Sequence, residues 1–133
     1  MKEGYRPFIM VNGHVKISVS SNGVLFSAAA VKRLNYSRYV NIYINNKEKL
    51  FAVEPVEKSG SISCDFYTPN KRGTVYVRWN NKDLLHCLSS MMNWNLSDHL
   101  YEIMGYFDYA NRIVEFDLKT AVRKTWREKK ELR

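Results

Sequence analysis

The feature that most constrains this fold is one order of segments that occurs twice along the chain. In each half, a short β-type run is followed by a helix-type run and then by two β-type runs that flank a polar turn. The segments are residues 24–26, 28–34, 39–44 and 50–53 in the first half, and residues 74–79, 82–93, 100–107 and 112–116 in the second half. Because each half is very small, the pattern predicts two β-α-β-β pseudo-repeats that share one core.

We therefore expect the whole chain, residues 1–133, to form a single α+β domain with an antiparallel, barrel-like sheet. The two pseudo-repeats would cover about residues 14–54 and about residues 61–117. The polar residues 55–60 form the best candidate boundary between them. With 45% hydrophobic residues, the chain can bury a shared core without disulfides or metal.

The last segment of the chain has a different periodicity. From about Asp117 onward, apolar residues recur at helical spacing, at Leu118, Ala121, Val122 and Trp126. The basic residues around this stripe are Lys119, Arg123, Lys124, Arg127, Lys129, Lys130 and Arg133. The pattern predicts a basic C-terminal helix over about residues 118–133, which would dock through its apolar side.

The charge of the chain indicates polyanionic partners. The formal net charge is +8, and residues 119–133 contribute +5 of it because only two of them are acidic. A basic surface of this kind favours nucleic acid, or an acidic protein, as the partner. The alternative is that the charge only keeps the protein in solution.

Membrane proteins and disulfide-linked proteins fit this sequence poorly. No apolar run approaches the ~20 residues that cross a bilayer, and the first residues do not form a long apolar signal segment. Cys64 and Cys87 are far apart and lack the Cys-x-x-Cys spacing of a zinc site. We therefore expect a cytoplasmic protein with reduced thiols, and neither a metal nor a cofactor.

The sequence offers little that suits catalysis. Asp83, His86 and Ser90 lie on one side of the predicted helix 82–93. A hydrolytic triad normally draws its members from different elements and also needs an oxyanion hole. No glycine-rich phosphate loop is present, since the six glycines are scattered. We therefore expect that the protein is not an enzyme.

Two stretches besides the tail can contact nucleic acid. Residues 71–79 partly resemble the base-stacking strand of the RNA-recognition motif, and strand alternation would place Arg72, Tyr76 and Arg78 on one exposed face. The alternative for residues 71–79 is an ordinary edge strand without a binding role. The alternative for the tail is a solvated helix that binds no phosphate. With two basic residues of the first predicted helix, the candidate nucleic-acid-binding residues are Lys32, Arg33, Arg72, Tyr76, Arg78, Lys119, Arg123, Lys124, Arg127 and Lys130.

The first half combines a short strand, a short helix and a hairpin in the segments Gly23–Leu34, Tyr39–Ile44 and Lys49–Val53. In this order it resembles the AbrB-type swapped-hairpin DNA-binding regulators. The resemblance implies half of an interleaved barrel, which the second half or a second chain in a homodimer would complete, and DNA rather than RNA as the partner. Ser27 stands where that family has a proline, and only Lys32 clearly matches its basic pair late in the helix.

These observations predict a non-catalytic, nucleic-acid-binding accessory or regulatory protein that contacts phosphates through its basic C-terminal helix. The alternative is a protein–protein interaction module, such as an inhibitor from a phage or mobile element that binds a host nucleoprotein complex. The nine tyrosines, three tryptophans and five methionines would suit such an interface.

Overall fold

The computed structural model describes residues 2–5, 8, 10 and 13–125, and in these residues the chain forms nine strands and two α helices. In chain order the elements are β1 (Lys16–Ser20), β2 (Gly23–Phe26), α1 (Ala28–Arg33), β3 (Tyr39–Asn45), β4 (Leu50–Val56), β5 (Ser63–Asp65), β6 (Val77–Trp79), α2 (Lys82–Met92), β7 (His99–Asp108), β8 (Ile113–Asp117), the 3-10 turn η1 (Leu118–Thr120) and β9 (Val122–Thr125).

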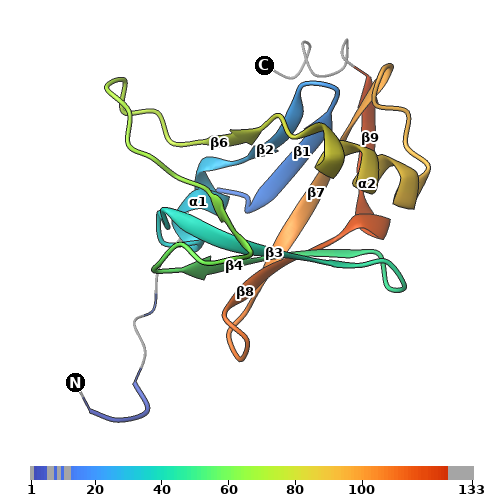
Figure 1. Ribbon diagram of the computed structural model, residues 1–133. Helices are drawn as coiled ribbons and strands as arrows, with labels where there is room; N and C mark the ends of the chain where they lie inside the picture. Colours follow the sequence, from blue (N-terminus) through green and yellow to red (C-terminus); the bar gives the residue numbers. More distant parts are fainter. Residues whose placement is uncertain (1, 6–7, 9, 11–12, 126–133) are drawn as a thin grey trace.

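All nine strands belong to one antiparallel sheet that curls around the core (Figure 1). The strand order is β5-β3-β4-β8-β7-β1-β2-β6, and β9 pairs with β7 beside this path. β7 is the longest strand, and it pairs with β1 along one edge and with β8 and β9 along the other. This strand therefore joins the two parts of the sheet into one curved surface.

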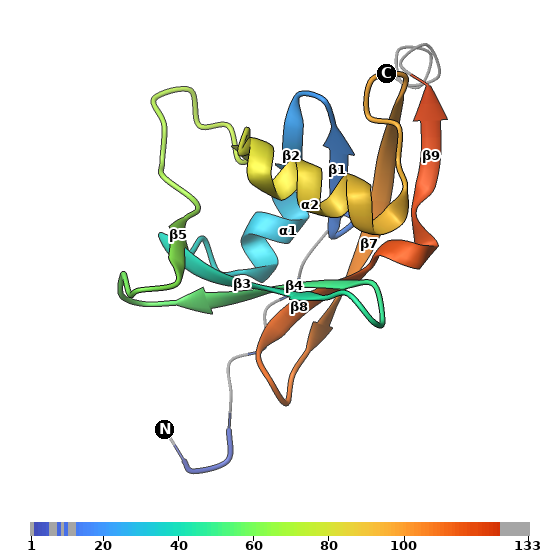
Figure 2. The ribbon, with the colours of Figure 1, turned by 45° about the vertical axis from the view of Figure 1, so that its right-hand side comes forward.

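The inner face of the sheet and both helices enclose one core. Phe26, Phe51 and Phe116 are fully buried, and the Phe116 ring packs against both of the others. Figure 2 shows α1 and α2 on the inner side of the curl, between the β3-β4-β8 part of the sheet and the β1-β2-β7 part. α2 buries Leu85 and Leu88 in this core.

The two helices begin in the same way, and a left-handed asparagine lies at or just after the end of each. The Ser27 hydroxyl and the Asn81 side-chain oxygen each accept a hydrogen bond from the backbone N–H of the third helical residue. Asn35 and Asn93, just beyond the helices, both have a left-handed φ of 57°. These caps limit α1 and α2 to short segments between strands.

The two halves of the chain are interleaved in the sheet. β1 of the first half pairs with β7 of the second, and β5 of the second half pairs with β3 of the first. β4 pairs with β8, and β2 pairs with β6. Exchanging β1 with β5, β2 with β6, β3 with β7 and β4 with β8 converts the β1–β7 and β3–β5 pairings into each other and leaves β4–β8 and β2–β6 unchanged. The body of the fold therefore has an internal pseudo-twofold arrangement.

The predicted α+β fold with a basic C-terminal helix is wrong. Strands dominate the described residues, and residues 118–125 form η1 and β9 rather than a helix. β9 pairs with His99–Glu102 of β7. The helical spacing of the apolar residues is overridden because this edge of β7 offers backbone hydrogen bonds to an extended chain. Residues 126–133 of the predicted helix lie outside the described residues.

Candidate nucleic-acid-binding hollow

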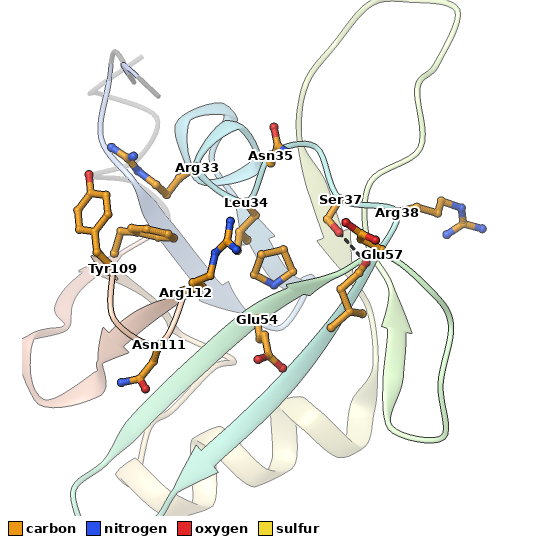
Figure 3. Close-up of a pocket in the computed structure, with 13 residues that line it drawn as sticks. Arg33, Leu34, Asn35, Ser37, Arg38, Glu54, Glu57, Tyr109, Asn111 and Arg112 are labelled. Atoms are coloured by element: carbon orange, nitrogen blue, oxygen red, sulfur yellow. Dashed lines mark hydrogen bonds between the residues drawn. The ribbon is translucent and has the colours of Figure 1, made fainter. Parts of the chain in front are cut away.

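A hollow opens between the end of α1, the end of β4 and the turn between β7 and β8 (Figure 3). It is lined by Arg33, Leu34, Asn35, Ser37, Arg38, Glu54, Pro55, Val56, Glu57, Phe107, Tyr109, Asn111 and Arg112. Its volume is about 800 Å³, which is large enough for a nucleotide-sized group.

The end of α1 forms one wall of the hollow. Val31 and Leu34 are fully buried and hold the helix end against the core. The chain then turns sharply, because Asn35 and Tyr36 have left-handed φ angles of 57° and 53°. Two such residues in succession are uncommon without glycine. The turn leaves Arg33, the last residue of α1, on the wall of the hollow.

The turn between β7 and β8 forms a second wall. The Asp108 carboxylate accepts hydrogen bonds from the backbone N–H groups of Ala110 and Asn111, and from the Asn111 side chain at 2.8 Å. The bond from the Asn111 side chain lowers the pKa of Asp108, which favours the charged carboxylate that closes the turn. Arg112 follows with a left-handed φ of 57° and points toward Leu34 (Figure 3).

Aromatic rings lie beside these arginines. The Arg33 guanidinium carbon is 5.4 Å from the centre of the Phe107 ring, which is a cation–π contact. Tyr109 packs edge-on against Phe107 with 4.7 Å between the ring centroids, and Tyr109 remains 41% exposed. The hollow thus combines guanidinium groups with exposed aromatic surface.

The other charged residues around the hollow face different directions. Figure 3 shows Glu54 pointing away from the hollow, and its carboxylate accepts a hydrogen bond from the Tyr43 hydroxyl at 2.9 Å. Arg38 points outward at the rim and pairs with Asp65 at 3.1 Å. Glu57 lies at the same end of the hollow as Arg38. The opposite end, beside Tyr109, is therefore the positively charged one.

The residues predicted to bind nucleic acid are dispersed over the structure. Arg33 lines the hollow, whereas its neighbour Lys32 does not. Arg72 lies in the loop before β6, and Arg78 is exposed on β6 itself. Tyr76 directly precedes β6 and is 52% exposed. The structure thus keeps Tyr76 and Arg78 close to each other but does not bring them into the hollow with Arg33.

Two lysines of the predicted basic tail are engaged in ion pairs. The Lys119 ammonium group pairs with Asp117 at 3.0 Å, and the Lys124 ammonium group pairs with Glu102 at 2.6 Å. Burial would raise the pKa of Glu102, but the hydrogen bond from Lys124, with further charge from nearby Lys16, outweighs it and lowers that pKa. These lysines therefore offer less charge to a partner than the sequence alone indicates.

Sequence reasoning missed Arg112 and Tyr109, which belong to the second hairpin turn. The turn itself was recognisable, and a tyrosine and an arginine so close together in it are the signal that could have drawn attention to this site. Among the other predicted residues, Arg123 is exposed on β9, and Arg127 and Lys130 lie outside the described residues.

Comparisons with known proteins do not assign the hollow. No protein-family model matches the chain, and no curated protein or solved structure matches it significantly. Among the described residues, no group of three or more His, Cys, Asp or Glu side chains is placed to hold a metal ion. No helix in that part of the chain has the length and apolarity needed to cross a membrane. The function must therefore be inferred from the hollow itself.

Proposed function

We propose that this protein is a non-catalytic, nucleic-acid-binding accessory or regulatory protein, and that the hollow is its binding site. One observation carries the proposal: Arg33 and Arg112 come from distant parts of the chain and line the same hollow as the partly exposed ring of Tyr109. Guanidinium groups bind phosphates, and exposed aromatic rings stack on bases. Cytoplasmic DNA is the partner that we propose, and the net charge of +8 would favour its approach.

The contacts available in the hollow favour binding that tolerates many sequences. Phosphate contacts are the same for every nucleotide and therefore carry no direct sequence information. Every base also has a flat face that can stack on an aromatic ring. An accessory or regulatory role suits such binding better than recognition of one defined site.

DNA titrations at several salt concentrations, followed by fluorescence anisotropy, test the proposal. We expect Arg112→Glu to weaken binding by about tenfold or more, because it removes a phosphate contact and adds a repulsive charge. The logarithm of the affinity should also depend less steeply on the logarithm of salt concentration, by about 0.7–0.9 for one lost phosphate contact. Arg112 is exposed, so the variant should fold normally.

Lys49→Glu is the matched control for this variant. Lys49 ends the turn between β3 and β4 with the same left-handed backbone, at a φ of 59°, but it does not line the hollow. The substitution changes the net charge equally and should alter the affinity by less than about threefold, because salt screens distant charges. Equal losses in the two variants, or no binding of DNA at low salt, would refute the proposal.

Two exposed tyrosines in one row across the sheet support the alternative, a protein–protein interaction module. Tyr43, Ala52, Glu115 and Tyr106 lie side by side across β3, β4, β8 and β7. Tyr106 is 70% exposed and Tyr43 is 43% exposed, and tyrosine is enriched in protein interfaces. A partner protein that is captured from nuclease-treated lysate, and that Tyr106→Ala releases while Arg112→Glu does not, would favour this alternative.

A further inference from the structure

The position of Tyr109 restricts the form of nucleic acid that can use the hollow. Its ring meets Phe107 edge-on, at an interplanar angle of 85°, so Phe107 does not stack over the faces of the Tyr109 ring. In a duplex, each base is stacked between its neighbours and presents only its edges to the grooves. A ring on the wall of a hollow can therefore stack only on a base that has left the helical stack.

The chain itself shows that Tyr109 accepts a flat ring. The Phe8 ring lies nearly parallel to the Tyr109 ring, with an interplanar angle of 7° and 6.3 Å between the ring centroids. Phe8 is 68% exposed, so little burial opposes its displacement. An incoming base can therefore take the place of Phe8 or stack on the remaining surface of Tyr109.

Arg33 and Arg112 line the same hollow as Tyr109, so they can bind the phosphates of a nucleotide that enters it. Arg33 is held by its contact with the Phe107 ring. Arg112 leaves a turn that is closed by three hydrogen bonds to Asp108. Because both arginines extend from restrained backbone, less conformational entropy is lost when they bind phosphate.

We propose that the hollow binds one unpaired nucleotide, from a single strand or from a bulge in a duplex. Its base would stack on Tyr109, and its phosphates would lie between Arg33 and Arg112. This inference rests on the proposed function, because it specifies which form of nucleic acid the hollow takes. Along its length, a blunt duplex would reach the arginines with its backbone but could not use the ring, because its internal bases are stacked on both faces.

Three labelled DNA probes of matched length test this inference: a single strand, a blunt duplex, and the same duplex with one bulged nucleotide. We expect the single strand and the bulged duplex to bind about tenfold more tightly than the blunt duplex, which is the size of one base–aromatic stacking contact. Tyr109→Ala should remove this advantage, whereas Tyr109→Phe should keep it because the ring remains. Tyr106→Ala is the matched control, since Tyr106 is exposed on β7 outside the hollow.

Two outcomes would overturn the inference. The blunt duplex could bind as tightly as the single strand, or Tyr109→Ala could weaken the binding of all three probes equally. Either result would leave the proposed function intact, because DNA would still bind and Arg112→Glu would still weaken it. If none of the three probes bound at low salt, the proposed function itself would fail, and the inference with it.

Discussion

The hollow and the equivalent region at the other end of the sheet are built in the same way but differ in one backbone contact. Each has a hairpin turn whose last residue is basic and has a left-handed backbone conformation. This residue is Arg112 in the turn after β7 and Lys49 in the turn after β3. At the Lys49 end, the Leu118 N–H donates a hydrogen bond to the Lys49 carbonyl at 2.9 Å. Continuing the β4–β8 register beyond Val53 and Val114 places Pro55 opposite Arg112 in the same way, and proline has no N–H to donate.

This difference shows how an internally repeated framework can keep one end open. The Lys49 end is the closed end, and there the Lys119 side chain also donates a hydrogen bond to the Glu48 carbonyl. The two helices also differ in length, since α2 has 11 residues and α1 has six. At the open end, a shorter helix and Pro55 leave a space that arginines line. The proposed binding site thus depends on a few departures from the repeat rather than on the repeat itself.

The packing of the two halves differs at Gly105, and this position gives the largest effect that we predict. A Cβ atom at Gly105 would lie 2.6 Å from a carbon of the Phe116 ring. The equivalent pair in the first half is Ile42 beside Val53, so the large and small residues have exchanged strands. Gly105→Ile should overpack the core and lower the free energy of unfolding by about 3 kcal/mol, as measured by urea denaturation.

A second substitution sharpens this comparison. Phe116→Val in the Gly105→Ile background recreates the pair found in the first half and should recover part of the lost stability. In a double-mutant cycle we expect a coupling energy of about 1 kcal/mol or more. Purely additive losses would show that the two halves are not equivalent in packing at this position.

Most local elements of the fold could be predicted from the sequence. The strand and helix periodicities matched the main strands and both helices. The start of α1 is also of a kind that sequence can indicate, because the Ser27 hydroxyl caps it by accepting a hydrogen bond from the Ala30 N–H. β9 could not be predicted in this way, because residues 118–125 have helical spacing. Its conformation is decided by a strand edge that only the assembled sheet provides.

The candidate site was only partly predictable. Arg33 was selected because it is basic and ends a helix, but its neighbours in the hollow come from segments that are distant in the sequence. Arg112 and Pro55 approach it only when the sheet curls. A count of basic residues also cannot show that Lys119 and Lys124 are engaged in ion pairs. Charge in the sequence therefore indicated the kind of partner but not the surface.

The β1–β7 and β3–β5 parts of the sheet also differ in the burial of their ion pairs, and this gives a prediction of intermediate size. Glu102 on β7 has a side chain that is 17% exposed, and it pairs with Lys124 and Lys16. Asp65 on β5 has a side chain that is 77% exposed, and it pairs with Arg38. Glu102→Gln should lower the free energy of unfolding by about 1 kcal/mol at neutral pH, and Asp65→Asn by less than about 0.5 kcal/mol. Urea denaturation of both variants measures the difference.

The lowered pKa of Glu102 adds a pH dependence to this prediction. The stabilisation from the ionised carboxylate is fully present above the unfolded pKa of about 4.3 and is lost as the pH falls through the lower folded pKa. The unmodified protein should therefore lose more stability than Glu102→Gln between about pH 6 and about pH 3. Parallel losses in the two proteins would show that Glu102 does not contribute to the acid sensitivity.

The smallest effect that we predict concerns Pro55 and tests why the hollow is open. Pro55→Leu gives position 55 a backbone N–H, as Leu118 has at the closed end. The Arg112 carbonyl can then accept a hydrogen bond from this N–H. One hydrogen bond contributes about 1 kcal/mol, and the greater freedom of the unfolded chain without proline costs about as much, so stability should hardly change. The hollow should narrow, and the affinity for single-stranded DNA should fall about threefold, which is about 0.7 kcal/mol.

Pro69→Leu is the control, because it removes a proline from the loop before β6 and adds no hydrogen-bond donor at the hollow. Its affinity for DNA should stay unchanged. In the Pro55→Leu protein, protection of the new amide from hydrogen exchange would show that the extra bond has formed. If that amide is protected and DNA still binds as before, the missing donor accounts for the shape of the hollow but not for its ability to bind.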